Sequence, residues 1–422
     1  MPFLHPSVAP TRALQAAESH PARRGIRSGS ALFVLLYALA STFFAAVPAS
    51  AEGTFTPPPG TVIAHQPAST RQYLGSPSIA ILAPGNYVVS HDFFGPGSSQ
   101  DTTRVFESRG SGEHWNQLAE IKGQWWSTLF SHGGKLYLLG TSRQDGDTVI
   151  RRSADGGRTW TQAVDSHSGL LLDGGHYHCA PVPVVTHAGR LWRAMEDTRA
   201  QGGWGRGFRS FVMSCPAEAD LLDADSWTRT APMPSQTNWA QGRFGDWLEG
   251  NVVIGPGGGV WNMLRVHVKD QPELAAMIRI SPDGSNASFD PVKDLVPFPG
   301  GCKKFLIRPD PKDAGTFWAM ANYVPPGQRD SIPERTRNTL ALLKSTDLRT
   351  WSVRAILLKH PDKAKHGFQY PDWQFEGDDD IVAAVRTAWD DAEGGAHSQH
   401  DANYITFHRF KGFRHLITGP DE

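Results

Sequence analysis

The sequence predicts an all-β chain folded as a six-bladed β-propeller, with four antiparallel strands in each blade. Three observations lead to this prediction: a tight polar turn at residues 153–160, weaker copies of that turn at regular intervals, and short alternating strand patterns between the copies. No long helical pattern interrupts these strands. A sandwich and a β-helix are the alternatives for repeated short strands, but neither accounts for a turn that recurs once per interval.

The turn at residues 153–160 reads Ser-Ala-Asp-Gly-Gly-Arg-Thr-Trp and follows an alternating strand pattern at 148–152. Asp155 can accept hydrogen bonds from the backbone of its own turn, and Gly156 and Gly157 tolerate a positive φ. Trp160 then supplies an apolar anchor. The sequence therefore predicts a self-capped turn that joins two strands and stabilises them.

Copies of this turn recur along the chain. Residues 345–351 keep the Ser, Asp, Thr and Trp, residues 108–115 keep the Ser, Gly and Trp, and residues 281–289 are a weaker copy. The marker positions are 108, 153, 214, 281, 345 and 408, and the five steps between them average 60 residues. This interval is typical of four-stranded propeller blades, so six markers predict six blades.

Each interval follows one order: an apolar strand, a glycine-rich turn, two further strands, the turn motif and a fourth strand. In blades one and two, the first three strands are predicted at 78–82, 86–90, 103–107, 127–131, 135–140 and 149–152. The later blades open at 180–186, 248–254, 304–308 and 368–375. Second strands follow at 260–266, 316–323 and 381–388, and a last third strand at 404–408.

Composition agrees with one large β domain. Of 422 residues, 43 are Gly, 31 are Pro and 14 are Trp, as expected for many tight turns with aromatic anchors. The net charge of −1, without a basic stripe, argues against a nucleic-acid partner. Cys179, Cys215 and Cys302 lack the spacing of metal ligands and are predicted to be buried thiols. The sequence predicts no metal site and no cofactor.

The first 51 residues are predicted to be an export signal. A basic leader precedes an apolar run at 31–46, and Ala-Ser-Ala at 49–51 offers a cleavage site of small residues. The apolar run is too short for a comfortable membrane anchor, so we expect no stable membrane span after cleavage. The mature chain is predicted to begin with a lead-in at 52–75, followed by the propeller at 76–422, in a periplasmic or secreted location.

The turn motif Ser-x-Asp-x-Gly-x-Thr-Trp resembles the Asp box of the sialidase superfamily, whose propeller blades carry this turn between their third and fourth strands. Sialidases open with Tyr-Arg-Ile-Pro, whereas residues 73–77 here read Tyr-Leu-Gly-Ser-Pro, so the first of the family's three carboxylate-binding arginines is missing. The segment from Glu249 through Arg265 resembles the family's fourth-blade segment. Residues 337–345 resemble the segment that carries the third arginine. The resemblance thus implies that Arg265 and Arg337 bind substrate.

The resemblance also implies catalytic roles. Tyr370, in Gln-Tyr-Pro-Asp at 369–372, lies where sialidases carry their nucleophilic tyrosine. A phenol with a pKa near 10 needs a neighbouring base, which the resemblance identifies as Glu249. Asp101, before the third strand of blade one, matches the family's acid/base aspartate, although a plain loop carboxylate is the alternative. Together these residues imply an exported, retaining exo-glycosidase with a carbohydrate substrate, a terminal acidic sugar.

A further group of polar residues has no counterpart in that family. His91 or Asp92, at the end of the second strand of blade one, is expected to face the propeller axis, as is His178 at the start of blade three. Histidine, tyrosine and arginine at one pit also suit β-elimination on a uronic acid. Two alternatives therefore stay open: a lyase or rhamnosidase-like propeller enzyme that uses His91, and a non-catalytic glycan-binding propeller.

Overall fold

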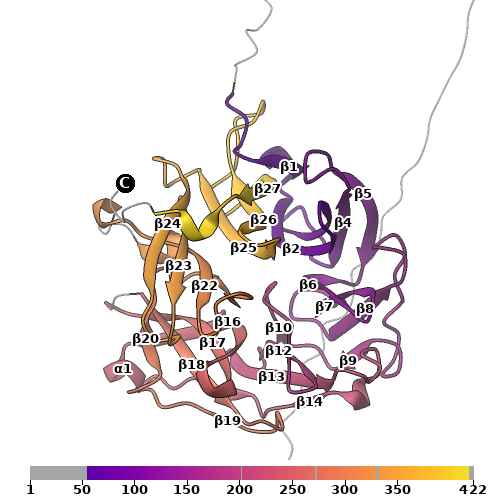
Figure 1. Ribbon diagram of the computed structural model, residues 1–422, viewed down its shortest axis with the longest axis vertical. Helices are drawn as coiled ribbons and strands as arrows, with labels where there is room; N and C mark the ends of the chain where they lie inside the picture. Colours follow the sequence, from indigo (N-terminus) through magenta and orange to yellow (C-terminus); the bar gives the residue numbers. More distant parts are fainter. Residues whose placement is uncertain (1–54, 201, 271–272, 329–331, 418–422) are drawn as a thin grey trace, which may run out of the picture. The chain divides into compact units, whose positions relative to one another are not determined.

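The computed structural model describes residues 55–417 apart from 201, 271–272 and 329–331, so the predicted leader at 1–51 lies outside the described residues. The described residues form six antiparallel sheets arranged in a ring (Figure 1). This arrangement confirms the predicted six-bladed propeller. Within the described part of the chain, no helix is long and apolar enough to cross a membrane.

The blades follow one another along the chain, and each begins with the strand nearest the axis (Figure 1). Blade one contains β2 (Tyr73–Ala83), β3 (Asn86–Phe94), β4 (Thr102–Ser108) and β5 (Asn116–Lys122). Blade two contains β6 (Trp125–His132), β7 (Lys135–Thr141), β8 (Thr148–Ser153) and β9 (Leu170–Leu172). Blade three contains β10 (Tyr177–His178), β11 (Val185–His187), β12 (Arg190–Asp197), β13 (Arg209–Pro216), β14 (Thr228–Arg229) and β15 (Met233–Pro234).

The second half of the ring repeats this order. Blade four contains β16 (Phe244–Ile254), β17 (Val260–Val268), β18 (Leu274–Ile280), β19 (Ala287–Ser288) and β20 (Leu295–Pro297). Blade five contains β21 (Leu306–Pro309), β22 (Phe317–Asn322), β23 (Thr339–Ser345) and β24 (Ser352–Lys359). Blade six contains β25 (Gly367–Glu376), β26 (Asp380–Ala388) and β27 (Tyr404–Phe410). The short helices are η1 (Ala68–Thr70), η2 (Ala224–Ser226), α1 (Trp239–Gly242), η3 (Pro256–Gly258), η4 (Pro326–Gln328), η5 (Pro333–Arg335) and η6 (Phe413–His415).

The fourth strand of blade six comes from the opposite end of the chain. β1 (Thr61–His65) pairs antiparallel with β27, so the last blade combines the two ends of the domain. The predicted lead-in at 52–75 therefore contains a blade strand, and β2 also begins before the predicted boundary at 76. The sequence did not reveal this closure, because pairing between β1 and β27 leaves no local pattern beyond a short apolar run.

The turn at residues 153–160 has the predicted self-capped geometry. Asp155 Oδ1 accepts the backbone N–H groups of Arg158 and Thr159 at 3.0 and 2.9 Å. Ser153 Oγ accepts the Gly157 N–H at 2.8 Å, and the Trp160 indole donates to the Gly157 carbonyl at 2.9 Å. The turn lies between β8 and β9 and away from the inner strands, which makes it a stabilising element.

Apolar side chains fill all six interfaces between neighbouring blades. Strand residues alternate between the two faces of a sheet, so each blade has two apolar faces, and each face packs against one of its two neighbours. Six buried clusters result, one for each pair of blades. The three cysteines are buried free thiols, as predicted. This packing makes the blade interfaces the main source of apolar stabilisation.

Hydrogen bonds also link the inner strands around the axis. The Ser78 hydroxyl donates to Asp372 Oδ2 of blade six at 2.6 Å and accepts the Leu129 N–H of blade two at 2.9 Å. Thr128 and Asn251 bond in the same way to the backbone of the following blade. Two further contacts complete the ring: Gly250 to Glu196 and Arg308 to Asp372. Contacts between blades thus satisfy these buried polar groups of the inner strands.

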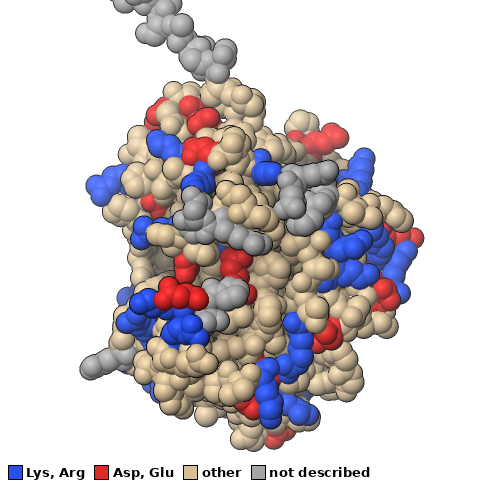
Figure 2. All heavy atoms as spheres, turned by 90° about the vertical axis from the view of Figure 1, so that its left-hand side faces the viewer, with Lys and Arg blue, Asp and Glu red and all other residues tan. Residues whose placement is uncertain are grey.

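The outer surface carries both signs of charge. On the face drawn in Figure 2, which shows the left-hand side of Figure 1, the described basic and acidic side chains are interspersed. This distribution agrees with the net charge of −1 for the whole sequence.

Candidate functional site

Four inner strands share a kink that turns one side chain toward the axis. Ser76, Trp126, Glu249 and Tyr370 have φ values of 45°, 50°, 59° and 51°, in the left-handed region that non-glycine residues seldom adopt. Each kink coincides with a break in the pairing of β2, β6, β16 or β25 with the next strand. The residue two positions later is the one that bonds to a neighbouring blade. Such bulges re-aim side chains and cluster at functional sites.

The four kinked residues line one pocket, which we call the axial pocket. Its volume is about 170 Å³, and five of the six blades contribute to it. Its lining consists of small, aromatic and polar side chains: Gly75, Ser76, Asp92, Phe94, Gln100, Trp125, Trp126, Gln144, His178, Cys179, Ala180, Trp204, Glu249, Tyr370, Arg386 and His400. Convergent polar groups inside a concave site make it the leading candidate for a binding or active site.

Three of the residues singled out from the sequence, Tyr370, Glu249 and Arg265, form a buried chain of contacts. The Tyr370 hydroxyl donates to Glu249 Oε1 at 2.7 Å, and Arg265 Nη1 donates to Glu249 Oε2 at 2.7 Å and to the Tyr370 oxygen at 3.4 Å. Burial opposes ionisation of Glu249, but the charges of Arg265 and His178 outweigh it and lower the pKa of Glu249. An ionised Glu249 is therefore poised to accept the Tyr370 proton.

Two further guanidinium groups lie against Tyr370. Arg337 Cζ is 5.9 Å and Arg386 Cζ is 4.8 Å from the centroid of the Tyr370 ring. Arg337 donates to Gln369 Oε1 at 2.8 Å, and Arg386 donates to the His400 carbonyl. Arg386 Nε is buried and has no partner among the described residues. Burial and the charge of Glu249 raise the pKa of Tyr370, and they outweigh the charges of the three arginines, which act to lower it.

Sequence reasoning did not identify Arg386. It lies in β26, within the apolar run that predicts the second strand of blade six. The signal was nevertheless present, because a single arginine in a buried strand needs a partner or a ligand, which was the argument applied to Arg265. Arg386 supplies a third guanidinium near Tyr370, although from another position than the arginine missing at residues 73–77.

Asp92 faces the axial pocket from the end of β3. Its side chain is 2% exposed, and Oδ2 accepts the Trp126 N–H at 2.8 Å. Burial raises the pKa of Asp92 to about 6. A Cβ atom at Gly75 would lie 2.6 Å from Asp92 Oδ1, so the glycine leaves the room that this carboxylate occupies.

His178 also lines the pocket. Its Nδ1 lies 2.8 Å from Glu196 Oε2, and Glu196 Oε1 accepts the Gly250 N–H at 3.1 Å. The edge of the ring packs against Trp126 and Trp204, with centroids 4.3 and 5.2 Å apart. Glu196 therefore fixes the orientation of the imidazole and the backbone beside Glu249.

His91 lies outside the axial pocket. It precedes Asp92 in β3 and so points to the other face of the sheet. Its ring stacks on Phe106 at 5.4 Å and meets Phe93 edge-on at 5.1 Å. Burial lowers the pKa of His91 to about 4. The structure thus places His91 in the packing between strands and not with the other predicted binding residues.

Asp101 is also separate from the pocket lining. Its Oδ1 accepts hydrogen bonds from Ser99 and Thr102 and lies 3.8 Å from Lys122 Nζ. Its neighbour Gln100 reaches the pocket, but Asp101 does not. The proton-donor role remains a prediction for Asp101, and its contacts direct the carboxylate toward its own loop.

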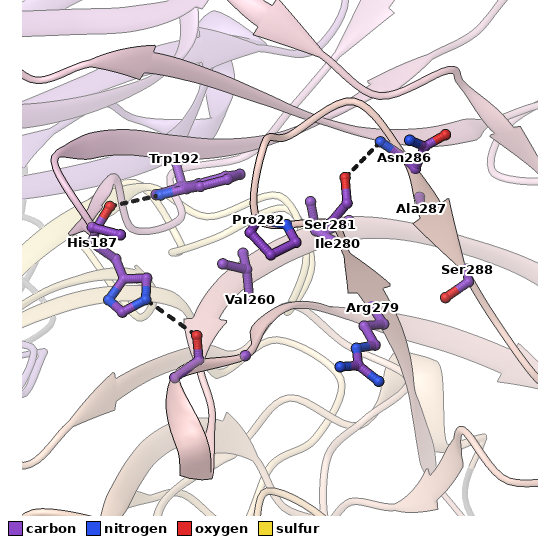
Figure 3. A pocket seen from close by; sticks show the side chains of 13 residues that line it. His187, Trp192, Val260, Arg279, Ile280, Ser281, Pro282, Asn286, Ala287 and Ser288 are labelled. Atoms are coloured by element: carbon purple, nitrogen blue, oxygen red, sulfur yellow. Dashed lines mark hydrogen bonds between the residues drawn. The ribbon is translucent and has the colours of Figure 1, made fainter.

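A larger cavity lies between blades three and four, beside the copy of the turn motif at 281–289, and is shown in Figure 3. Its volume is about 340 Å³. The Trp192 indole donates to the His187 carbonyl at 3.2 Å, and the Asn286 N–H donates to Ser281 Oγ at 2.9 Å. No carboxylate lines this cavity among the described residues. Proton-transfer chemistry is therefore better supported in the smaller axial pocket.

The described residues contain no group of three His, Cys, Asp or Glu side chains arranged to hold a metal ion. Among the described residues that line the axial pocket, the groups available for chemistry are one phenol, two carboxylates, two histidines, a thiol and one guanidinium.

Solved structures similar to this chain share its propeller fold. An α-L-arabinanase of Penicillium chrysogenum, solved with arabinobiose, is 15% identical with a TM-score of 0.55, over 85% of this chain and 99% of that one. The α-L-arabinofuranosidase of Fusarium graminearum is 12% identical with a TM-score of 0.55, over 85% and 98%. A Hadza microbial sialidase is 11% identical with a TM-score of 0.56, over 83% and 68%. No protein-family model and no curated protein sequence matches the chain. The chain thus has the sialidase-like propeller fold.

Proposed function

We propose that this protein is an exported exo-glycosidase that releases a terminal acidic sugar with retention of configuration. The observation that carries the proposal is the hydrogen bond of 2.7 Å from the Tyr370 hydroxyl to Glu249 inside the axial pocket. A fold shared with sialidases and arabinan-degrading glycosidases supports glycoside hydrolysis. The leader predicted at 1–51 supports export.

Tyr370 is the proposed nucleophile. Glu249 accepts the phenolic proton as the Tyr370 oxygen bonds to the anomeric carbon, and Arg265 stabilises the ionised Glu249. A tyrosine suits an anomeric centre that bears or adjoins a carboxylate, because a neutral nucleophile avoids the repulsion that an aspartate or glutamate would meet. Water then cleaves the tyrosyl-glycoside, and the two displacements together retain the configuration.

Arg337 and Arg386 are proposed to bind the sugar carboxylate. Both guanidinium groups lie beside the Tyr370 ring, and Arg386 lines the pocket with a buried Nε that has no protein partner among the described residues. Guanidinium groups form strong, charge-assisted hydrogen bonds with carboxylates. Arg265 is already paired with Glu249, so it contributes mainly through that residue.

The size of the pocket supports removal of a single terminal sugar. Its volume of about 170 Å³ is below the roughly 300–1,000 Å³ of pockets that hold drug-sized ligands. The aromatic side chains of Trp125, Trp126 and Trp204 provide apolar surface for a sugar ring. A small pocket with aromatic walls suits one residue at the end of a glycan.

The contacts in the axial pocket support a lyase or a non-catalytic glycan-binding propeller less well than a glycosidase. A lyase that uses His91 would need this histidine at the pocket, whereas it packs against Phe93 and Phe106. A glycan-binding propeller without activity would not require a phenol bonded to an ionised glutamate. Hydrolysis of a neutral α-L-arabinofuranoside is the second candidate, because two of the structural neighbours are arabinan-degrading enzymes that align over nearly their whole length.

Turnover of nitrophenyl glycosides tests the proposal. The panel contains sialic and other ulosonic acids, uronic acids and an α-L-arabinofuranoside, and the configuration of the first product is read by NMR. We expect retention, release from an acidic sugar, and a loss in kcat/KM of at least about 1,000-fold for Tyr370→Phe. Arg386→Gln should raise KM for the acidic sugar by about 10- to 100-fold.

Tyr137→Phe is the matched control, since Tyr137 is buried in blade two and does not line the axial pocket. Wild-type turnover in Tyr370→Phe, or no turnover of any glycoside by the native protein, would overturn the proposal. Release of arabinose alone would refute the acidic substrate and favour the second candidate. An unsaturated product that absorbs in the ultraviolet would identify a lyase.

A further inference from the structure

The axial pocket contains a second carboxylate that the nucleophile does not use. Among the described residues that line it, Asp92 and Glu249 are the two acids. Both oxygens of Glu249 are engaged, Oε1 by the Tyr370 hydroxyl and Oε2 by Arg265. Cleavage of a glycosidic bond also needs an acid that protonates the departing oxygen. Among the described residues, Asp92 is the other carboxyl group that lines the pocket.

The surroundings of Asp92 suit a proton donor. The carboxyl group accepts the Trp126 N–H at 2.8 Å and interacts with the Ser76 hydroxyl, which are both neutral donors. Asp92 forms no ion pair with a described residue, although Arg386 is close enough to act on it through space. Burial at 2% exposure raises its pKa to about 6 and so favours the protonated form in mildly acidic solution.

The pKa of Asp101 is shifted in the opposite direction to that of Asp92. Burial acts to raise its pKa, but hydrogen bonds from Ser99 and Thr102 and the charge of Lys122 outweigh burial and lower it. Asp101 is therefore ionised under conditions in which a proton donor has to be protonated. Its side chain is also held by its own loop and does not line the pocket.

We propose that Asp92, and not Asp101, is the general acid and base of the axial site. The inference rests on the proposed glycosidase function. In the first step Asp92 gives its proton to the glycosidic oxygen, the bond from that oxygen to the anomeric carbon breaks, and the Tyr370 oxygen bonds to this carbon while its proton passes to Glu249. The aglycone leaves as an alcohol.

In the second step Asp92, now a carboxylate, takes a proton from water. The water oxygen bonds to the anomeric carbon, the bond from this carbon to Tyr370 breaks, and Glu249 returns the proton to the phenolate. One water is consumed, one sugar and one alcohol are released, and all three side chains regain their starting protonation. The two roles of Asp92 follow from the same position in the pocket.

Other titratable groups face Asp92 from the elements packed around the pocket. These groups are Arg386, His400, Cys179, His178, Glu249 and Tyr370. Burial lowers the pKa of His400 to about 4 and raises that of Cys179 to about 12. The pKa of Tyr370 is raised and that of Glu249 is lowered. We therefore expect deprotonation of Asp92 to lower activity above about pH 6, and the Asp92→Asn variant tests this expectation.

Leaving-group dependence tests the inference. The kcat/KM values of the native enzyme, Asp92→Asn and Asp101→Asn are measured with aryl and alkyl glycosides of the preferred sugar that span a wide range of leaving-group acidity. We expect Asp92→Asn to lose about 100- to 10,000-fold on alkyl glycosides and less than about 10-fold on a dinitrophenyl glycoside, because an acidic phenol departs without protonation. Azide should partly restore turnover of the dinitrophenyl glycoside and form a glycosyl azide.

The pH profile of the native enzyme gives an independent measurement that needs no variant. With an alkyl glycoside, kcat/KM should fall above about pH 6, and this fall should disappear with the dinitrophenyl glycoside and in Asp92→Asn. An equal loss on all leaving groups in Asp92→Asn, or leaving-group dependence confined to Asp101→Asn, would overturn the inference. In either case turnover by the native enzyme and its loss in Tyr370→Phe would leave the proposed function standing.

Discussion

The carboxylate of Asp92 should make the folded protein less stable as the pH rises, and Asp92→Asn should remove this effect. Asp92 is 2% exposed, has no ion-pair partner among the described residues and accepts the Trp126 N–H. Asparagine has nearly the same shape and can accept the same hydrogen bond through its amide oxygen. The substitution therefore changes the charge of a buried group and little else.

The size of the effect follows from the pKa of Asp92, which burial raises from 3.8 to about 6. A rise of about two pKa units, at about 1.4 kcal/mol per unit, corresponds to about 3 kcal/mol. Because the pKa is higher in the folded state than in the unfolded state, the stabilisation is complete below about pH 4 and is lost as the pH rises through 6. Asp92→Asn should thus match the native protein at pH 4 and exceed its free energy of unfolding by about 3 kcal/mol at pH 8.

Calorimetry at pH 4.5 and pH 8 measures the difference as a change in Tm. For a domain of this size, about 3 kcal/mol corresponds to about 4 °C. Asp101→Asn is the matched control on the same blade, and it should be destabilised at pH 8, because the pKa of Asp101 is lowered in the folded state. An equal change in Tm at both pH values for Asp92→Asn, or a loss of stability at pH 8, would refute the reasoning.

Three further substitutions test other parts of the structure. Asn251→Ala removes two buried hydrogen bonds between blades four and five, so the free energy of unfolding from denaturant titration should fall by roughly 2–4 kcal/mol. Asp155→Ala removes the acceptor of the self-capped turn and should lower stability by roughly 1–2 kcal/mol with kcat/KM unchanged, which separates the turn from the site. Gly75→Ala places a Cβ atom 2.6 Å from Asp92 Oδ1, so kcat/KM for alkyl glycosides should fall by about 10-fold or more while a thermal melt still shows a folded protein.

Local sequence patterns were sufficient to predict most of the fold. The second strand of blade two, predicted at 135–140, is β7 at Lys135–Thr141, and the turn at 153–160 lies where the spacing requires it. The closing strand β1 was missed because its partner β27 is more than 300 residues away in the sequence. Strand patterns report alternation within a segment, whereas ring closure depends on which distant segment completes the last sheet.

The site was only partly predictable, because kinks in the inner strands decide which side chains reach the axis. The resemblance to sialidases located Tyr370 and Glu249, which the structure joins by a hydrogen bond. It did not separate His91 from Asp92, although alternation allows only one of two neighbours to face the pocket. A left-handed φ at residues such as Tyr370 has no sequence signal when the residue is not glycine. The precise direction of a side chain therefore had to come from the structure.

The surroundings of Gly75 leave little space for a longer side chain in the segment at 73–77, where the arginine is missing. A Cβ at position 75 would lie only 2.6 Å from Asp92 Oδ1, and Phe94 is the next nearest side chain at 3.1 Å. The guanidinium of Arg386 from blade six lies over the Phe94 ring, with Cζ 4.3 Å from the ring centroid. Blades six and one are neighbours, joined by the contact of Asp372 with Ser78. The guanidinium of Arg386 in blade six can therefore act in the part of the site that an arginine of blade one would otherwise occupy. The loss of one arginine from blade one is thus compatible with carboxylate binding, and it leaves room for a buried acid beside the nucleophile.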